Sequence, residues 1–350
     1  MKLKKQCLRA VSGVLAASVM AAMVLTSCGG TNPPASSSQP TSSSTSTSQP
    51  SSSSTSSSSS VSSKPDPNKV NWTYEQNGAK TVTLTGYDST CKEPDRVLTL
   101  PSQIDGYTVT EISGSVFSGA KFREVTIPAS IKKIGAWAFS SCPNLTKVTI
   151  QGAETLGEAA FYFCSNLESV SLNNEITAIG KIAFAACRKL SSVNLPAKLK
   201  TIGESAFLST KLSGKLVIPS SVTTIGEYAF SGTSISELSL PAGVKTIGKS
   251  AFSGTGISYL VLPEGITEIE SGAFGGCDNL RNVYIPASVK YIDGDAFGVG
   301  VAGDVFGVPL ENVYYGGSEA AWNQIDIATG NDKLASAAKH FGAKPTDLSF

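Results

Sequence analysis

Phenylalanine recurs at intervals of 22 or 23 residues, and this period constrains the fold more than any other feature of the chain. The repeated residues are Phe117, Phe139, Phe161, Phe184, Phe207, Phe230, Phe252, Phe274 and Phe297. Around each of them the chain repeats a pattern close to I-G-x-x-A-F, followed by an L-x-x-V-x-I-P run. A unit this short cannot bury its own apolar face and must stack on its neighbours. The spacing therefore predicts a solenoid.

Each unit contains a short run in which apolar and polar residues alternate, such as residues 125–127 or 283–285. Alternation indicates a strand with one buried face, and the proline that follows, such as Pro128, ends it because proline has no N–H to donate. Parallel stacking places equivalent residues about 4.8 Å apart, so nine rungs make a sheet about 40 Å long. A second apolar pair, such as Val222 with Ile225, closes the coil on the opposite side.

Glycine usually follows the isoleucine of that second pair. The positions are Gly135, Gly180, Gly203, Gly226 and Gly248. Glycine suits a turn that needs positive φ, or a close approach between two backbones.

The repeated pattern resembles that of the BspA-type bacterial leucine-rich repeat family. The resemblance rests on stretches such as residues 202–207 (Ile-Gly-Glu-Ser-Ala-Phe) and 216–219 (Leu-Val-Ile-Pro), and it covers about two-thirds of the chain. Residues 101–109 resemble the opening repeat of the family, and residues 313–331 resemble its terminal unit. The resemblance implies a leucine-rich repeat solenoid, a β-rich, right-handed coil of short parallel strands with an N-terminal β-hairpin cap and a C-terminal α/β cap. It also implies a surface protein that binds other macromolecules, in some members host matrix proteins.

Residues 1–27 have the features of a bacterial lipoprotein signal peptide. Four basic residues precede an apolar stretch from Ala10 to Val24, which is short for a membrane span. Residues 25–28 (Leu-Thr-Ser-Cys) resemble a lipobox, which implies cleavage before Cys28 and acylation of its thiol. An ordinary secretory signal and a retained transmembrane helix are the alternatives. We expect an extracytoplasmic protein that is lipid-anchored to the bacterial cell membrane or surface.

Residues 28–69 are rich in serine, threonine and proline. Serine and threonine make up 19 and 5 of the 34 residues from 31 to 64. Such a tract cannot bury enough apolar surface to fold, so it is predicted to be a disordered tether, which composition would also allow to be O-glycosylated. As a flexible coil it would span roughly 35 Å on average.

The folded part of the chain is predicted to have three segments. Residues 70–96 form an N-terminal capping hairpin, because alternating strands flank Asn77-Gly78. Residues 97–316 form the solenoid of about nine repeats. Residues 317–350 lose the repeat and form a C-terminal cap and tail, with a short helix near Lys333 to His340.

The seven cysteines suggest a disulfide framework until their places in the repeat are compared. Cys142, Cys164, Cys187 and Cys277 each stand three residues after a repeat phenylalanine, where other units have Thr210, Thr233 and Thr255. Parallel rungs hold Cβ atoms farther apart than a disulfide requires, so we interpret this slot as a row of small buried side chains. Disulfide pairing among the first three is the alternative. A zinc site is disfavoured because the thiols lie in a line.

No catalytic residue, metal site or cofactor is predicted. His340 is the only histidine, and with no partner motif for a catalytic triad it is interpreted as a surface residue. Residues 298–303 match G-x-G-x-x-G formally, but they follow a repeat phenylalanine rather than a βαβ strand. They belong to an insertion between Phe297 and Leu310 that is either a flexible loop or a binding loop.

Acidic residues gather near the end of the repeats. Glu270 and Asp293 take the usual place of the turn glycine, with Glu268 and Asp295 nearby. A solvated edge is the favoured interpretation. A weak Ca²⁺ site is the alternative, because Ca²⁺ needs six or more oxygen ligands, and a pair of hydrolase carboxylates has less support.

The charge balance disfavours nucleic acid as a partner. Removing residues 1–27 takes away four of the 28 basic residues and no acidic residue, so the net charge becomes 24 − 27 = −3. The chain has no basic stripe with interleaved aromatic residues.

The outward face of the strands is the predicted binding surface. The residues between the two core positions are Thr126, Thr149, Ser171, Asn194, Val217, Ser239, Val261, Tyr284 and Tyr314. The last rungs gather Tyr259, Val261, Tyr284 and Tyr314, and exposed aromatic side chains on a rigid face provide contact area at low entropy cost. An aromatic ladder that packs against the cap or the 298–309 loop is the alternative.

These observations predict a non-enzymatic, surface-anchored binding protein, an adhesin or protein-interaction module that uses the strand face of the solenoid. Its partner is expected to be an extracellular or host protein, and the lipid on Cys28 would attach it to the membrane. The alternative is a carbohydrate-binding or cell-wall-associated module that uses the same tyrosines on a glycan.

Overall fold

The computed structural model describes residues 70–88, 97–298 and 310–348. All described residues belong to one compact unit, Pro65–Phe350. The predicted signal peptide, the tether, Cys91 and nearly all of the 298–309 loop lie outside the described residues. Within the described ranges, no helix combines the length and apolar character needed to cross a bilayer.

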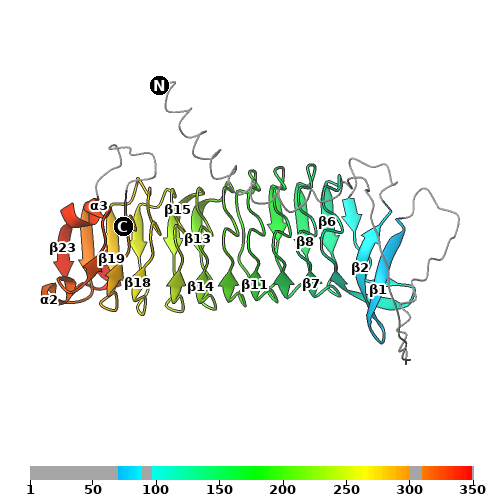
Figure 1. The fold of residues 1–350 in the computed structure, drawn as a ribbon, viewed down its shortest axis with the longest axis horizontal. Coiled ribbons are helices and arrows are strands. Elements are labelled where there is room, and N and C mark those ends of the chain that lie inside the picture. The colour runs from blue at the N-terminus through cyan, green and yellow to red at the C-terminus, as the bar shows by residue number, and fades with distance from the viewer. Residues whose placement is uncertain (1–69, 89–96, 299–309, 349–350) are drawn as a thin grey trace, which may run out of the picture. The chain divides into compact units, whose positions relative to one another are not determined.

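The described unit is a β-solenoid of about 11 turns, which confirms the predicted fold class (Figure 1). One side of the coil carries a sheet in the order β1-β2-β5-β7-β9-β11-β12-β14-β16, which we call the isoleucine-side sheet. Its strands are β1 (Trp72–Gly78), β2 (Thr81–Tyr87), β5 (Tyr107–Ile112), β7 (Lys133–Ile134), β9 (Thr155–Leu156), β11 (Ala178–Ile179), β12 (Thr201–Ile202), β14 (Thr224–Ile225) and β16 (Thr246–Ile247), and β4 (Gln103–Ile104) pairs with β5.

The opposite side of the coil carries the alternating strands of the repeat in three separate sheets. The first contains β3 (Val97–Thr99), β6 (Glu124–Ile127), β8 (Lys147–Ile150) and β10 (Ser169–Ser171), and the second contains β13 (Ser213–Val217) and β15 (Ser234–Ser239). The third contains β17 (Tyr259–Val261), β19 (Asn282–Ile285), β21 (Asn312–Tyr315) and β23 (Ala338–Phe341). We call the outward sides of the first and third sheets the N-terminal and C-terminal strand faces.

The nine repeat phenylalanines form one continuous stack through the core. Consecutive ring centroids lie 4.8 to 5.8 Å apart, with interplanar angles of 2° to 15°. The rings are almost completely buried, and burying one phenylalanine contributes about 1.5–3 kcal/mol. The 22- and 23-residue period therefore corresponds to one ring per turn of the coil.

The glycine after each core isoleucine is required by close approach between rungs, and not by positive φ. A Cβ on Gly203 would lie 2.7 Å from the carbonyl carbon of Gly180 and from the nitrogen of Lys181. Gly135, Gly180 and Gly226 are equally crowded by backbone atoms, at 2.6 to 2.7 Å. Backbone on the neighbouring rung cannot move aside as a flexible side chain can, so glycine is the residue that fits.

The isoleucine-side sheet ends where this glycine is replaced. Backbone N–H groups of Gly226 and Gly248 donate to the isoleucine carbonyl of the preceding rung, at 2.8 and 2.9 Å. Among the described residues, no such bond joins Glu270 to Ile247, and a new sheet starts with β18 (Glu268–Ile269), followed by β20 (Tyr291–Ile292) and β22 (Asp326–Ile327). The break is confined to this rung, because Asp293 also replaces the glycine and its N–H still donates to the Ile269 carbonyl at 2.9 Å.

The solenoid stacking extends beyond the predicted segment 97–316 at both ends. β1 and β2 form the predicted hairpin, and β2 also pairs in parallel with β5. At the other end β23 pairs in parallel with β21, and β22 pairs with β20. The capping role of these ends remains a prediction.

The prediction of a helix near Lys333 to His340 is wrong for the second half of this range. Helix α3 covers Asp332–Ser336, and the chain then becomes strand β23. Helix α2 (Glu319–Trp322) and the 3-10 turn η1 (Pro345–Asp347) complete this end. The alternation of exposed and half-buried residues in β23 is short, and neither a repeat phenylalanine nor a proline marks it, so the repeat pattern missed this rung.

Candidate binding surface

The N-terminal strand face displays small polar residues in register. Thr99 pairs with Thr126, Thr126 with Thr149, and Thr149 with Ser171. Ion pairs flank this row, for example Lys147 with Glu124, whose charged atoms lie 3.9 Å apart. Exposed pairs of this kind contribute at most about 1 kcal/mol. This row is polar and contains no aromatic side chain.

The C-terminal strand face has a different composition. Its central row pairs Val261 with Tyr284, Tyr284 with Tyr314, and Tyr314 with His340. The Tyr314 and His340 rings stack with centroids 4.7 Å apart and an interplanar angle of 16°. Tyr314 is half-buried and His340 is exposed, so the stacked pair is accessible from solvent.

An adjacent row on the same face is held by side-chain hydrogen bonds. Tyr259, Asn282 and Asn312 are paired in register, and all three are half-buried. Nδ2 of Asn312 donates to Oδ1 of Asn282 at 2.9 Å, and Nε2 of His340 lies 2.9 Å from Oδ1 of Asn312. A carbonyl oxygen can only accept, so Nε2 of His340 carries the proton in this arrangement. These bonds fix the side chains before any partner arrives.

Tyr284 does not belong to the exposed surface, which corrects the prediction made for it. Only 2% of its surface is accessible, and its hydroxyl donates to Oε1 of Glu264 at 2.7 Å. Burial, the bond to Glu264 and the nearby charge of Asp347 raise the pKa of Tyr284. At this rung the tyrosine side chain is packed inside the molecule and not displayed. Val261 and Tyr259 are half-buried, as is Tyr314.

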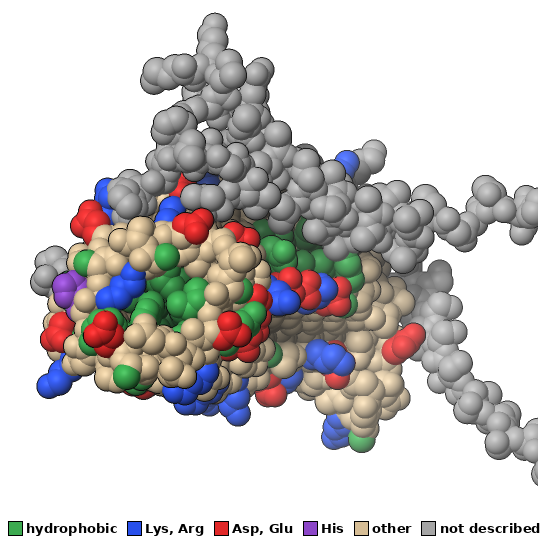
Figure 2. Space-filling view, turned by 60° about the vertical axis from the view of Figure 1, so that its left-hand side comes forward, with side chains coloured by type: hydrophobic (Ala, Val, Ile, Leu, Met, Phe, Trp, Pro, Cys, Tyr) green, Lys and Arg blue, Asp and Glu red, His purple; other side chains and the backbone are tan. Residues whose placement is uncertain are grey.

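The end of the coil adds an apolar area beside this face. Figure 2 shows the C-terminal end with hydrophobic side chains at its centre, bordered by charged ones and by the single histidine. Ile327 on β22 and Phe341 on β23 are 39% and 37% exposed. Phe341 pairs with the buried Tyr315, so its side chain lies on the opposite face of β23 from His340.

Buried thiols occupy the predicted slot. Cys142, Cys164, Cys187 and Cys277 are free and buried. Each thiol donates to the phenylalanine carbonyl of the preceding rung, as Cys164 does to Phe139 at 3.1 Å, whereas Thr210 donates to Phe207 of its own rung at 2.9 Å. Burial raises the pKa of Cys277 to about 11, so the thiol stays protonated near neutral pH. The slot is structural, as the sequence predicted.

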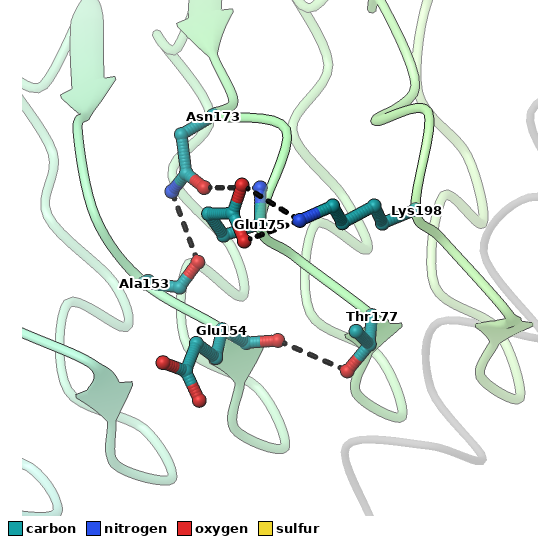
Figure 3. Close-up of polar contacts among 6 residues, drawn as sticks. All are labelled: Ala153, Glu154, Asn173, Glu175, Thr177 and Lys198. Carbon is teal, nitrogen blue, oxygen red and sulfur yellow. Dashed lines mark hydrogen bonds and ion pairs between the residues drawn. The ribbon is translucent and has the colours of Figure 1, made fainter.

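Polar contacts tie the turns of three successive rungs together where the usual proline is absent (Figure 3). Asn173 stands in the proline position, and its Oδ1 accepts from the N–H of Glu175 at 2.7 Å. Its Nδ2 donates to the carbonyl of Ala153 on the preceding rung at 3.0 Å. Lys198 on the following rung then binds both carboxylate oxygens of Glu175, at 3.0 and 2.7 Å. These bonds replace the stiffness of proline, so the network is structural.

The acidic residues near Glu270 are not arranged as a cation site. Among the described residues, no group of three or more His, Cys, Asp or Glu side chains could hold a metal ion. Burial and the neighbouring charge of Glu268 raise the pKa of Glu270. Asp293 instead accepts from the Tyr291 hydroxyl and from the N–H of Gly294, at 3.2 and 2.6 Å.

The fold and this surface define a class of protein, a parallel β-solenoid built from leucine-rich repeats. The family described as the BspA type leucine rich repeat region matches six copies over residues 99–213 and 207–299. These matches cover more than half of the chain, which therefore belongs to this family. They indicate no enzyme family.

Solved structures of bacterial leucine-rich repeat proteins are similar to this chain. A leucine-rich repeat protein from Bacteroides ovatus is 26% identical with a TM-score of 0.54, over 75% of this chain and 66% of that one. A leucine-rich cell surface protein from Faecalibacterium prausnitzii is 23% identical with a TM-score of 0.40, over 73% of this chain and 96% of that one. A leucine-rich repeat protein of T. pallidum is 21% identical with a TM-score of 0.37, over 78% and 97%. No match is found among curated proteins.

Proposed function

We propose that this protein is a non-enzymatic binding protein, anchored at the bacterial surface through the lipid on Cys28, that holds a protein partner on its C-terminal strand face. Membership of the leucine-rich repeat family supports an interaction role, because stacked repeats present extended binding surfaces. The lipobox and the serine-rich tract support presentation outside the cell.

The observation that carries the proposal is the exposed Tyr314–His340 stack beside the Asn282–Asn312–His340 hydrogen bonds. Aromatic side chains supply much of the binding energy at protein interfaces. Groups already fixed by neighbours lose little freedom on binding, so more of the contact energy appears as affinity. The N-terminal strand face has neither property.

The proposal is tested by exposing the full-length chain to arrays of extracellular-matrix proteins and of glycans. We expect a saturable protein ligand whose binding falls about 30-fold when Tyr314→Ser and His340→Ser are combined, the loss typical of an interface hot spot. The matched control is Thr126→Ser with Thr149→Ser on the N-terminal strand face, which should bind like the unmodified chain. Melting temperatures of both variants identify any loss caused by unfolding.

Two results would contradict this proposal. Binding of the protein ligand that survives the Tyr314→Ser and His340→Ser double variant would place the interface elsewhere. Ligands found only on the glycan array, and lost in that variant, would establish the carbohydrate-binding alternative at the same site.

A further inference from the structure

Three aromatic side chains gather on the phenylalanine turns of two neighbouring rungs, and the repeat does not account for them. The Trp137 and Tyr162 rings lie 5.7 Å apart at 74°, and the Tyr162 and Phe163 rings lie 6.0 Å apart at 37°. All three side chains are half-buried. We call Trp137, Tyr162 and Phe163 the turn aromatics.

Most other units have small residues in these slots. The position of Phe163 elsewhere in the described units holds only glycine, serine or alanine, at Gly119, Ser141, Ala186, Ser209, Gly232, Gly254 and Gly276. The position of Tyr162 is mostly serine, alanine or glycine, with Leu208 as the one large residue. The position of Trp137 also holds Ile182 and Tyr228, so it is the combination of three aromatic rings that occurs at one place along the described coil.

Backbone conformation makes this choice unfavourable. The φ angles of Trp137 and Phe163 are 61° and 57°, in the left-handed region that side chains other than glycine disfavour. Ile182 occupies the Trp137 slot at φ 47°, but it is 3% exposed and gains by packing. Trp137 and Phe163 remain half-exposed, so burial offsets less of the free-energy cost of their positive φ than it does for Ile182. The stability of the fold therefore does not explain these large rings.

An exposed carboxylate lies on the same turn as Tyr162 and Phe163. The Trp137 N–H donates to the carbonyl of Glu158 at 2.8 Å, so the backbone of Glu158 lies beside that of Trp137 on the next rung, and its side chain is exposed. The following charged residue along this edge is Lys181, which forms an ion pair with Glu204 at 2.8 Å.

We propose that the turn aromatics form a second binding site, which takes an arginine or lysine side chain of a partner protein. The ring faces of tryptophan, tyrosine and phenylalanine attract cations, and the three rings are half-exposed. The exposed carboxylate of Glu158 on the same turn favours a basic side chain over an acidic one. The site lies on the phenylalanine turns, so it is separate from the C-terminal strand face.

The test uses the full-length chain and a fluorescein-labelled heptapeptide of arginine, with binding followed by fluorescence anisotropy. We expect saturable binding that weakens about tenfold in Trp137→Gly, the size of one desolvated cation–π contact. Glycine tolerates the positive φ of this position, so the melting temperature should be unchanged or higher. Tyr228→Gly is the matched control, because Tyr228 has the same slot and a φ of 54° four rungs away. It should bind like the unmodified chain.

Phe163→Gly is the second variant, in case Trp137→Gly folds poorly. Gly232 and Gly254 already occupy the same slot with similar φ angles of 68° and 69°, so this change is compatible with the coil. Weakened binding in either stable variant supports the site. Unchanged binding in both, or equal binding of a citrulline heptapeptide, overturns it, as does the absence of arginine-peptide binding at millimolar concentration. Competition by neutral maltoheptaose would instead indicate a glycan site.

Discussion

The coil follows one pattern up to Gly254. From Tyr259 onward, both its isoleucine side and its strand face differ from that pattern. In the regular region the glycines that follow the core isoleucines form a row, which we call the glycine row. It lets the isoleucine-side rungs approach closely, and the strand face carries mainly small polar residues. In the C-terminal region Glu270 and Asp293 replace the glycine, a separate sheet forms, and the strand face carries tyrosine, asparagine and histidine. The phenylalanine stack continues across this boundary, with Phe252 and Phe274 stacked at 5.8 Å and 2° after separations of 5.3 Å in the preceding pairs.

This difference shows that a solenoid can change its surface while its phenylalanine stack continues. The phenylalanine stack fixes the rungs in both regions, and only the slots outside the core change. Each repeat contacts mainly its neighbours, so a block of rungs can acquire a new surface without altering the rest of the coil. We infer that the C-terminal region is the specialised part of the molecule.

The glycine row provides the largest expected effect. Gly203→Ala should lower the free energy of unfolding by about 3 kcal/mol, since the added Cβ overlaps backbone of the preceding rung. Urea denaturation followed by circular dichroism measures the loss. Gly294→Ala in the C-terminal region is the control, because its Cβ would meet nothing closer than 3.5 Å. A loss for Gly294→Ala as large as for Gly203→Ala would show that overlap with the preceding rung is not the cause of the effect.

Tyr284 is buried, whereas Tyr314 is partly accessible. A change at Tyr284 therefore tests whether the buried tyrosine stabilises the fold or binds the partner. Tyr284→Phe removes the buried bond to Glu264 and should cost about 1 kcal/mol while leaving partner binding unchanged. The raised pKa of Tyr284 adds a pH signature: the stabilisation is complete below the ordinary tyrosine pKa of about 10 and is lost as pH rises above it. Denaturation at pH 7 and pH 10.5 measures both. Weaker partner binding by this variant would return Tyr284 to the binding surface.

Glu270 gives the smallest expected effect. Because its pKa is raised, the folded state holds this proton more tightly than the unfolded state, and stability falls as pH rises from the ordinary glutamate value upward. Glu270→Gln should therefore raise stability at pH 7 by less than about 1 kcal/mol, and the gain should vanish near pH 4. Glu204→Gln, which breaks the ion pair with Lys181, should have the opposite sign at pH 7. Equal pH profiles for Glu270→Gln and the unmodified chain would refute this account.

The repeat made the core predictable from the sequence. The stack of phenylalanines, the buried cysteine and threonine slot and the Asn77-Gly78 hairpin each follow from a local pattern or a period, and the structure has all three. The close approach at the glycine row was one of two predicted reasons for glycine, and the φ angles decided between them.

The candidate surface was less predictable, because it depends on what covers each rung. Tyr284 has the sequence position of an outward residue, yet Glu264 from an earlier turn and the C-terminal end enclose it. His340 joins the surface because β23 adds a rung without the repeat phenylalanine. Alternation along one strand cannot report contacts made by segments far away in sequence.

The most direct test of the binding surface is hydroxyl-radical footprinting of the full-length chain with and without its array-identified protein ligand. Our account predicts that oxidation of Tyr314 and His340 falls on binding, that Tyr284 reacts little in either state, and that Tyr162 does not change. Unchanged oxidation of Tyr314 and His340 in the saturated complex would contradict the central claim that the C-terminal strand face holds the partner.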